Sequence, residues 1–591
     1  MSSDSPDSIV FGAAGFIGRA VVAELLRRGN RVAAAVRGNP DRLTSWLDGE
    51  GVPLGGLSVV RADITTSGLG LPPTGLDGVR DVYNCAARFA FGLSVEEARA
   101  ANVTGALNVL DWAAERAGLR RVVHISGYRV SPGPGGEQPD YRREGAYEAS
   151  KKEGDTAIRA RAAERGIPLT IANPSTAIGP GQFLGLASMV SDLWHGRLPA
   201  VPGGREVFVP VVDVRYLAAF MTRLPEHEET AGRAYWILDD RTPVLPDLIA
   251  LLARHMGVRA PRHSIPVGLL RRLPRALIGV DPETLSFLSP DRYDTGPARA
   301  FAERAGLSPP PIEDALTSWA DDLVAARFGA APAPSGPYGY QDVAGVRTWV
   351  IGEREHPGYV LLHGLPLDAG SWRQVTDRLG APALAADLPG QGRSGPPAEE
   401  PLPPEETLDV WMSGLLRPVR RRPVLVAHSF ACGPALRYAA AHPHAISRLV
   451  LVAPAFLQRP GPRLSRSWAA VPLLRRLPRA RLAAMLGVPE GDLADLARPG
   501  RARNVVAALR AGHSQRDELR RLLERVEVPV EIVVGSDDPL AVAVDVPVTT
   551  IDGAGHYPQL THPATLAARL EGELSPRTGV VTRQASWKLT R

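Results

Sequence analysis

Two groups of residues in this chain have the types and the spacing needed for catalysis. The first is the segment Tyr147-Glu-Ala-Ser-Lys151, which places a phenol and an ammonium group four positions apart. On a helix the two side chains share one face, so the lysine can lower the tyrosine pKa and hold a nucleotide ribose. The phenol could then exchange a proton with a substrate oxygen. Because the chain contains only three lysines, this spacing favours proton-transfer chemistry over coincidence.

The second group begins at Ser429, which follows the apolar run 424–427 and precedes a helical stretch. A nucleophilic serine in a sharp strand-to-helix turn needs small residues two positions before and after it, and alanine fills both places. Such a serine needs a base, and the base needs an orienting acid. Asp538 follows a late apolar run and His556 lies in a glycine-rich loop. The order Ser, Asp, His is the one associated with this turn, so we interpret the three as nucleophile, acid and base.

A glycine-rich turn near the start of the chain could bind phosphate. The apolar run 9–11 leads directly into Gly12-Ala-Ala-Gly15-Phe-Ile-Gly18 and then into a helical stretch. The first glycine permits a tight turn, the second lets a pyrophosphate approach the backbone, and the third lets helix and strand pack closely. Free N–H groups at the helix start favour an anion. We therefore expect a dinucleotide to contact Gly12, Gly15, Phe16, Ile17 and Gly18.

The residue after the second apolar run bears on which dinucleotide binds. An acidic side chain at this place would bind the ribose 2′-hydroxyl of NAD, whereas an arginine accommodates the 2′-phosphate of NADP. The chain has Arg37 there. This favours NADP(H), with NAD(H) still open, because Arg37 could also be a surface residue beside the turn.

These residues must be positioned by strands and helices, and the apolar pattern predicts both. From residue 8 to about 326, short apolar runs alternate with longer helical segments, and the alternation restarts after a proline- and alanine-rich stretch at 330–337. Such alternation is typical of α/β proteins with parallel, doubly wound sheets. We expect a cofactor-binding domain at 1–326, a linker at 327–340, a second domain at 341–575 with a helical cap at about 455–526, and a flexible tail at 576–591.

Composition excludes several classes of protein. The 591 residues are 44% apolar and 22% charged, which is ordinary for a globular protein, and no apolar run approaches the ~20 residues of a membrane span. The net charge is +5, and arginine supplies nearly all of the positive charges. This preference for arginine over lysine is typical of GC-rich genomes such as those of actinobacteria. Basic tracts interleaved with aromatic residues are missing, so we expect no nucleic-acid partner. The dense arginine stretch 459–481 could bind an anionic substrate tail or form a solvated helix face.

The same sequence predicts a cytoplasmic enzyme without a metal ion. Its first residues lack the basic and apolar regions of a secretory signal. The two cysteines, Cys85 and Cys432, lie far apart and have no partner at disulfide or metal spacing. We expect a small-molecule substrate, carrying an acyl or carbonyl group, and neither a membrane nor a metal partner.

With these motifs in place, the first half resembles an extended short-chain dehydrogenase/reductase of the NAD-dependent epimerase/dehydratase type, over about residues 8–325. Further matches lie at 63–64, 84–87, 102–110 and 173–179. The resemblance implies a Rossmann fold, and many relatives pair into homodimers. It also implies cofactor contacts with adenine at Asp63 and Ile64, along the cofactor at Ala86 and Ala87, beside the nicotinamide at Pro174 and Thr176, and at Lys151.

One departure from that family concerns the end of the fifth apolar run, Ile125-Ser126-Gly127-Tyr128. Relatives carry paired Ser-Ser or Ser-Thr here, and the second of the pair hydrogen-bonds the substrate oxygen. Gly127 occupies that place. Ser126 could substitute after a small backbone shift, the Tyr128 hydroxyl could reach in, or Ser126 could simply end the strand.

The half from about 341 to 575 resembles the α/β-hydrolase family with a helical cap. The segment 361–366 is similar to that family's oxyanion loop, and 387–394 to the turn after its next strand. The resemblance implies Ser429 as nucleophile, His556 as base and Asp538 as acid, with Asp537 less favoured because relatives place the acid beside the proline. Backbone N–H groups of Leu365 and Phe430 would form the oxyanion hole.

Together these features predict a bifunctional enzyme. The first half would be an NADP(H)-dependent carbonyl reductase or alcohol dehydrogenase, and the second a serine hydrolase that cleaves an ester, thioester or lactone. Two alternatives remain open for the first half: a catalytically weak, cofactor-binding regulatory domain, or an epimerase or dehydratase that retains NAD. The fusion suggests that both halves act on one metabolite.

Overall fold

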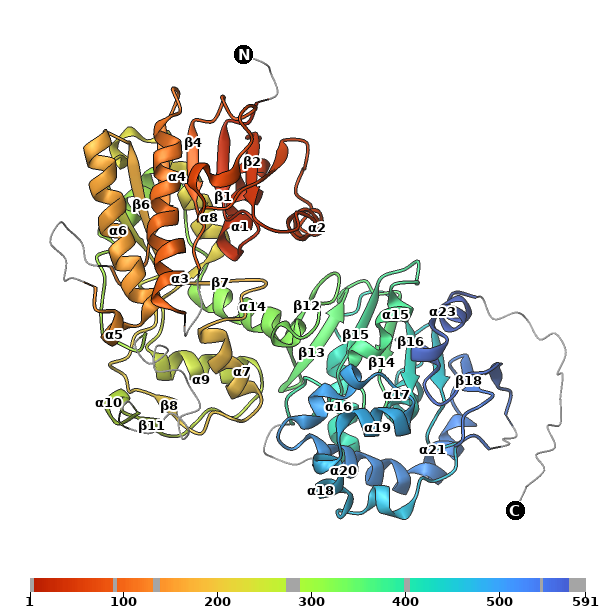
Figure 1. The fold of residues 1–591 in the computed structure, drawn as a ribbon. Helices are drawn as coiled ribbons and strands as arrows, with labels where there is room; N and C mark the ends of the chain where they lie inside the picture. Colours follow the sequence, from red (N-terminus) through yellow and green to blue (C-terminus); the bar gives the residue numbers. More distant parts are fainter. Residues whose placement is uncertain are drawn as a thin grey trace. The chain divides into compact units, whose positions relative to one another are not determined.

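The computed structural model describes residues 5–88, 93–130, 139–270, 272, 287–397, 404–542 and 546–572. Within them the chain forms two compact units, Met1–Ala333 and Pro334–Arg591 (Figure 1). The tail expected to be flexible, 576–591, lies outside the described residues. Among the helices of the described ranges, none is long and apolar enough to cross a membrane.

The first unit is built on a seven-stranded sheet in which every neighbouring pair is parallel. This confirms the expected doubly wound Rossmann fold. The strand order reverses between β1 and β4, and the crevice at that point is where such sheets bind nucleotides. In spatial order the strands are β10 (Ala234–Ile237), β6 (Leu169–Pro174), β5 (Arg121–Ile125), β4 (Asp81–Asn84), β1 (Ser8–Phe11), β2 (Val32–Val36) and β3 (Leu57–Arg61).

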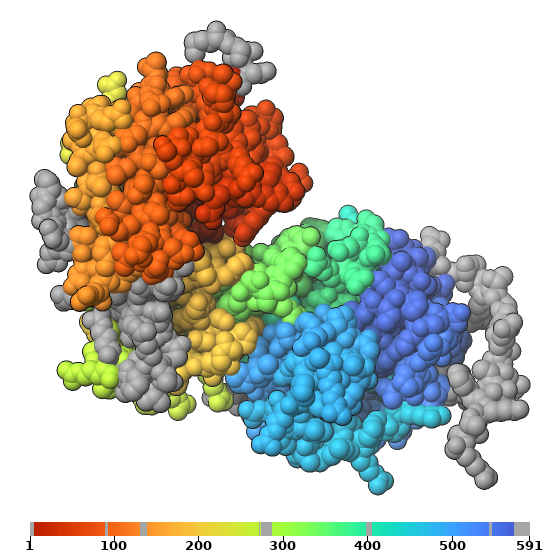
Figure 2. Space-filling model, in the orientation of Figure 1, coloured from red at the N-terminus to blue at the C-terminus, as the bar shows by residue number. Residues whose placement is uncertain are grey.

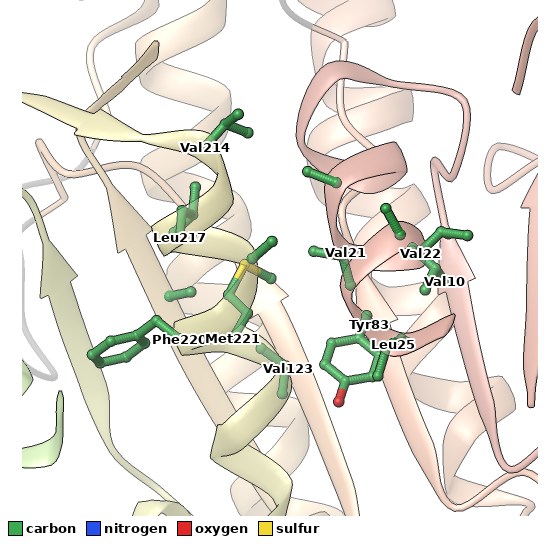
Figure 3. Close-up of a cluster of buried hydrophobic side chains, with 14 of the residues drawn as sticks. Val10, Val21, Val22, Leu25, Tyr83, Val123, Val214, Leu217, Phe220 and Met221 are labelled. Atoms are coloured by element: carbon green, nitrogen blue, oxygen red, sulfur yellow. The ribbon is translucent and has the colours of Figure 1, made fainter. Parts of the chain in front are cut away.

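Helices cover both faces of this sheet, which is why strands such as β1 and β2 are mostly apolar. On β1, Val10 packs on one face, whereas Ile9 and Phe11 pack on the other. Figure 3 shows side chains of α1 (Phe16–Arg27) and α8 (Val214–Arg223) gathered with Val10, Tyr83 and Val123 on the first face. The opposite face is covered by α4 (Gly105–Ala114) and α6 (Ala146–Arg165).

The remaining elements of the first unit surround this core. Among them, four short strands form two small parallel sheets, β7 with β9 and β8 with β11. They are α2 (Asp41–Gly49), η1 (Ser67–Gly70), α3 (Val95–Arg99), the π-helical η2 (Ala100–Thr104), α5 (Tyr141–Glu144), β7 (Thr176–Ile178), α7 (Leu186–Trp194), β8 (Val201–Pro202), β9 (Val211–Asp213), η3 (Leu224–Glu226), η4 (Glu228–Thr230), α9 (Leu245–His255), β11 (Ser264–Ile265), α10 (Val267–Leu270), α13 (Gly296–Arg304), α14 (Ile312–Ala325) and η5 (Arg327–Gly329).

The second unit contains an eight-stranded sheet. Its first two pairings, β12 with β13 and β13 with β15, are antiparallel and all others are parallel. This confirms the expected α/β-hydrolase fold. In spatial order the strands are β12 (Tyr338–Val343), β13 (Val346–Gly352), β15 (Ala383–Ala386), β14 (Tyr359–Leu362), β16 (Val424–His428), β17 (Arg448–Val452), β18 (Val530–Gly535) and β19 (Thr549–Ile551).

Helices again pack on both faces of this sheet. One face carries α16 (Pro404–Leu416), α17 (Cys432–Ala441) and α21 (Arg516–Leu523), and the other carries η6 (Ala369–Trp372), α15 (Arg373–Thr376) and α23 (Pro563–Glu571). Two short helices accompany the loops, η7 (Ser429–Ala431) and α22 (Pro558–Thr561).

A helical cap is inserted between β17 and β18, as expected. It comprises η8 (Arg463–Arg466), α18 (Ala470–Arg476), α19 (Arg479–Leu486), η9 (Glu490–Ala497), α20 (Arg501–Ser514) and α21. In Figure 2 these residues, in shades of blue, form a continuous part of the surface of the second unit.

Helix α1 begins at Phe16, with Gly15 at the N-cap position. Two other local features were not expected from the sequence. Strand β10, at the edge of the first sheet, has only four residues and gave no separate apolar signal. The expected linker 327–340 overlaps η5 and the start of β12 at Tyr338, since a tight turn at Ala344 and Gly345 lets β12 pair with β13.

Candidate active sites

The glycine-rich turn has the geometry of a phosphate cradle. Gly12 has a φ of +72°, and a Cβ there would lie 2.8 Å from the Ala86 backbone. A Cβ on Gly18 would lie 2.1 Å from the Gly12 carbonyl oxygen, so only glycine allows α1 to pack this closely. Gly15 is exposed, which leaves the N–H groups of Phe16 and Ile17, in the first turn of α1, available to an anion.

Two charged residues lie at the adjoining carboxyl ends of β2 and β3. Arg37 is exposed directly after β2. The pKa of Asp63 is lowered because the Thr65 hydroxyl and backbone N–H donate to its Oδ1 at 2.7 and 2.9 Å, and the Arg37 guanidinium lowers it further. Ile64 follows, and its carbonyl accepts a hydrogen bond from Asn108 at 2.8 Å. An anionic and a cationic group therefore lie together where the resemblance places adenosine.

Tyr147 and Lys151 lie one turn apart on α6, with Tyr147 partly buried and Lys151 buried. Lys151 Nζ donates to the Ile125 carbonyl at 2.9 Å, which links the helix to the end of β5. Burial lowers the pKa of Lys151 to about 8, although Asp155 and Glu148 act to raise it. Lys151 was expected to lower the pKa of the Tyr147 phenol, but burial, and then the charge of Glu148, raise it. At neutral pH the phenol therefore carries its proton.

The ends of β5 and β6 hold buried polar atoms that lack partners. Among the described residues, Ser126 Oγ, both amide atoms of Asn173 and Ser175 Oγ have no hydrogen-bond partner. Unpaired buried polar groups are rare in folded proteins, so these atoms fit a bound group that carries donors and acceptors. Pro174 ends β6 and Thr176 begins β7 beside them.

The remaining predicted residues of this site lie after β4 and β5. Ala86 is partly buried, and its N–H donates to Asn84 Oδ1 at 3.2 Å, while Ala87 is exposed. Tyr128 is buried, and its ring packs edge-on against that of Tyr293. A Cβ built on Gly127 would have Lys151 Cβ at 4.0 Å as its nearest contact, so nothing in the packing requires glycine there.

In the second unit, the backbone of Ser429 is strained in the way a nucleophile elbow requires. Its φ is +53°, a left-handed conformation that costs a non-glycine residue about 1 kcal/mol or more. The turn lies between β16 and the helical segment of η7 and α17. A Cβ on Gly364 would lie 2.8 Å from Ser429 Cβ. The loop carrying Leu365 therefore reaches the serine because residue 364 has no side chain.

Three of the predicted residues form one hydrogen-bonded series. His556 Nε2 lies 3.1 Å from Ser429 Oγ, and His556 Nδ1 lies 3.0 Å from Asp538 Oδ2. Asp538 is buried, whereas the neighbouring Asp537 accepts a hydrogen bond from Ser536 at 2.9 Å instead. The geometry thus brings Ser429, His556 and Asp538 together and leaves Asp537 outside.

A cavity of about 360 Å³ adjoins Ser429 and Phe430 and is closed on one side by the cap helix α20. Within the described residues, no cluster of three or more histidine, cysteine or acidic side chains could hold a metal ion. The serine, its base and a cavity of small-molecule size form an arrangement suited to acyl transfer.

Comparison with family models accounts for both halves. Residues 8–237 match the NAD dependent epimerase/dehydratase family, and residues 359–569 match the alpha/beta hydrolase family. The chain is a fusion of these two families. Both are families of enzymes, and the first is described as NAD-dependent.

Individual relatives match part of the chain. Sterol demethylase protein B of Methylococcus capsulatus is 29% identical over 276 residues, which are 45% of this chain and 79% of that protein. The 3beta-hydroxysteroid-dehydrogenase/decarboxylase isoform 1 of Arabidopsis thaliana is 25% identical, over 53% of this chain and 79% of its own. The pimeloyl-[acyl-carrier protein] methyl ester esterase of Aromatoleum aromaticum is 29% identical, over 36% of this chain and 97% of its own.

The hydrolase domain contains two site residues that sequence reasoning missed. Gln458 is buried, and its Nε2 donates to Asp538 Oδ2 at 2.6 Å. His428 donates from Nε2 to the His556 carbonyl at 2.8 Å, and burial, then the charge of His556, holds its pKa well below the ordinary value. His428 therefore stays neutral and fixes the histidine loop. Gln458 lies in the cap, where no motif marks it.

The epimerase/dehydratase domain likewise holds a supporting pair. Asn102, in the π-helical η2, donates from Nδ2 to Ser150 Oγ at 2.9 Å, and Ser150 Oγ donates to the Tyr147 carbonyl at 2.8 Å. A Cβ on Gly154 would lie 2.3 Å from the Asn102 carbonyl oxygen, so this glycine lets α6 approach η2. The contacts fix the helix turn that carries Tyr147 and Lys151.

Proposed function

We propose that the hydrolase domain cleaves an ester, thioester or lactone through an acyl-Ser429 intermediate. The observation that carries this proposal is the series Ser429–His556–Asp538, with distances of 3.1 and 3.0 Å on a strained turn. The name of the Aromatoleum relative, a methyl ester esterase, supports ester chemistry.

In the proposed reaction His556 Nε2 accepts the Ser429 proton as Oγ attacks the substrate carbonyl carbon. The carbonyl oxygen becomes negative and is stabilised by the N–H groups of Leu365 and Phe430. His556 then gives the proton to the leaving oxygen or sulfur. A water molecule, deprotonated by His556, releases the acid and restores Ser429. Asp538, held by Gln458, orients the imidazole throughout.

We propose further that the epimerase/dehydratase domain transfers hydride between NADP(H) and a carbonyl or alcohol. The glycine turn would hold the pyrophosphate, Asp63 and Ile64 would contact the adenine, and Ala86, Ala87, Pro174 and Thr176 would line the rest of the cofactor. Bound NADP(H) would supply or accept the hydride. Tyr147 would exchange the proton with the substrate oxygen, Lys151 would hold the ribose, and Ser126 would hydrogen-bond the substrate. The Arabidopsis relative is named a hydroxysteroid dehydrogenase, which supports this reaction type.

Replacing Arg37 by alanine tests the choice of cofactor. We expect NADPH affinity to fall by about tenfold or more, since one charge-assisted hydrogen bond to the 2′-phosphate is worth about 1.5–3 kcal/mol. NADH affinity, which does not depend on that phosphate, should change little. Fluorescence titration of both cofactors against wild type and variant measures this, and an equal loss for both would contradict the NADP preference.

The reductase rate should depend on the proton of Lys151. Its pKa of about 8 lies below its ordinary 10.5, so the folded protein loses this proton first as the pH rises. The cation that holds the ribose is then lost, and kcat/KM for reduction should fall about tenfold per pH unit above pH 8.

Two controls accompany this pH profile. In a Lys151→Arg variant the fall should move above pH 9, because arginine keeps its charge; the same profile in both proteins would overturn the assignment. The effect of this proton on stability has the opposite sign. Between about pH 8 and 10.5 the unfolded chain binds more protons than the folded chain, so the contribution of Lys151 to the free energy of unfolding rises with pH in that window.

Gly127→Ser should increase reductase turnover. The position has room for a side chain, with the nearest atom 4.0 Å from a built Cβ, and its φ lies outside the left-handed region. A serine hydroxyl there would add a hydrogen bond to the substrate oxygen, worth about 1 kcal/mol or a fivefold to tenfold rate gain. Gly127→Ala is the matched control, and an equal gain from alanine would show that the hydroxyl is not responsible.

Gly127 also favours a second candidate function, in which this domain binds the cofactor and regulates the hydrolase without turnover. A panel of esters and thioesters of graded chain length, assayed with and without NADPH, separates the two. Hydrolysis that changes with NADPH while no cofactor is oxidised would support regulation. NADPH oxidation with a carbonyl substrate would support the reductase, and tightly retained NAD in the purified protein would favour an epimerase or dehydratase instead.

A further inference from the structure

We propose that the cavity beside Ser429 binds an extended acyl chain between α17 and α20, and that Arg437 at its far end binds a neutral oxygen on that chain. This rests on the proposed hydrolase function and adds a substrate class to it: medium-length acyl groups that carry a hydroxyl or carbonyl near the end.

The cavity follows two helices. On the η7–α17 side it is lined by Ser429, Phe430 and Arg437, and on the α20 side by Ala508, Ala511 and Gly512. Arg437 is eight positions after Ser429, so at about 1.5–2 Å per residue the two lie about 12–16 Å apart along the helix. An extended carbon chain of about ten bonds covers that distance.

Small residues on α20 create this space. Ala508, Ala511 and Gly512 line the cavity with small side chains or none. A Cβ on Gly512 would already lie 3.1 Å from the Phe430 ring. A larger side chain at these positions would therefore occupy the volume that we assign to the acyl chain.

The far end of the cavity is polar and ordered by hydrogen bonds. Arg437 donates from Nε to both oxygens of Asp409 at 2.8 and 3.0 Å and from Nη1 to Gln515 Oε1 at 2.9 Å. Gln515 Nε2 in turn donates to Glu405 Oε2 at 2.7 Å. Arg437, Gln515 and Glu405 all line the cavity.

One hydrogen-bond donor of the Arg437 guanidinium has no acceptor among the described residues. Arg437 Nη2 is buried and has no hydrogen-bond partner among the described residues. A buried donor without an acceptor is unfavourable, so an oxygen atom of the ligand would satisfy it. The lining is otherwise mostly apolar carbon, which suits the methylene groups between this oxygen and the reacting carbonyl.

The charges around Arg437 determine whether a neutral or a negatively charged oxygen of the ligand fits there. Arg437 is already paired with Asp409, and Glu405 adds a second carboxylate. A carboxylate at the end of the substrate would be a third negative group beside one cation, which is unfavourable at short range. A hydroxyl or carbonyl oxygen can accept the Nη2 hydrogen bond without adding charge.

The first experiment measures kcat/KM for thioesters of one fixed thiol with unbranched acyl chains of increasing length. Wild type should prefer about eight to twelve carbons. Ala511→Leu should shift the optimum to shorter chains, and Ser514→Leu should not. Ser514 is exposed on the same helix, outside the cavity. An unchanged length optimum in Ala511→Leu would overturn the acyl assignment.

The second experiment compares three acyl chains of equal length that end in methyl, hydroxymethyl or carboxylate. Wild type should prefer the hydroxyl over the methyl end by about tenfold and should disfavour the carboxylate. In Arg437→Met the ratio of hydroxyl to methyl should fall to about one. Because loss of the Asp409 pair could affect folding, thermal unfolding of the variant is measured, and the wild-type ratios alone already decide whether the far end prefers a neutral oxygen.

Different results would contradict the hydrolase function and the assignment of the cavity. If Ser429→Ala hydrolyses these thioesters as wild type does, the proposed hydrolase function is wrong. If hydrolysis depends on Ser429 but wild type shows no length optimum and no preference for the hydroxyl end, only the cavity assignment is wrong.

Discussion

Replacing Ser429 by alanine is expected to lower ester or thioester hydrolysis by about 10⁵-fold or more, the order of effect seen when a hydrolase loses its nucleophile. Without Oγ no acyl intermediate forms, and the His556 imidazole has no hydroxyl proton to accept. Alanine keeps the same Cβ at a φ of +53°, so the backbone strain and the stability should change little. Steady-state hydrolysis of the best substrate measures the rate, and thermal unfolding measures the stability.

Ser514→Ala is the matched control, since Ser514 is exposed and donates only to the Ala511 carbonyl of its own helix. It should hydrolyse at the wild-type rate. Residual Ser429→Ala activity within tenfold of wild type would contradict the nucleophile assignment. Loss of NADPH oxidation in the same variant would contradict independent sites in the two domains.

Tyr147→Phe is expected to reduce carbonyl reduction by about 10²–10⁴-fold, the range that one positioned proton donor contributes. The ring and its packing on α6 are kept, and only the phenolic O–H is removed. Because burial raises the pKa of this phenol, the wild-type group carries its proton at neutral pH and can donate it to a developing alkoxide. NADPH oxidation in the presence of a carbonyl substrate measures the effect.

Cofactor affinity separates a chemical effect from a structural one. Tyr147→Phe should bind NADPH as tightly as wild type, because the phosphate cradle is formed by the turn between β1 and α1 rather than by α6, and it should leave ester hydrolysis intact. Tyr141→Phe, which removes the phenol that donates to Glu153, is a matched control on neighbouring α5. Equal losses in both tyrosine variants would point to folding rather than proton transfer.

Much of the fold and the hydrolase site could be predicted because each depends on local pattern. Buried parallel strands such as β14 and β16 are short apolar runs, and a nucleophile elbow requires small residues at fixed offsets from Ser429. The order of Asp538 and His556 along the chain then follows from the fold. The structure brings these residues within hydrogen-bonding distance.

The supporting residues could not be predicted, since they act across long sequence separations and without a motif. Gln458 reaches Asp538 from the cap, 80 positions away, and Asn102 reaches Ser150 across 48 positions. Amide and hydroxyl groups of this kind occur throughout the chain. Only the packing of α6 against η2, and the contact of Gln458 with the loop after β18, show which of them matter.

The strained turn at Ser429 also affects which substitutions this position can accept during evolution. Glycine at this position would relieve a backbone cost of about 1 kcal/mol and would stabilise the domain while abolishing its hydroxyl. Natural proteins are rarely at their stability optimum, because selection removes only the substitutions that lower stability below what function needs. Under the proposed hydrolase function, a strained serine is expected to persist at this position, because only its hydroxyl can act as the nucleophile.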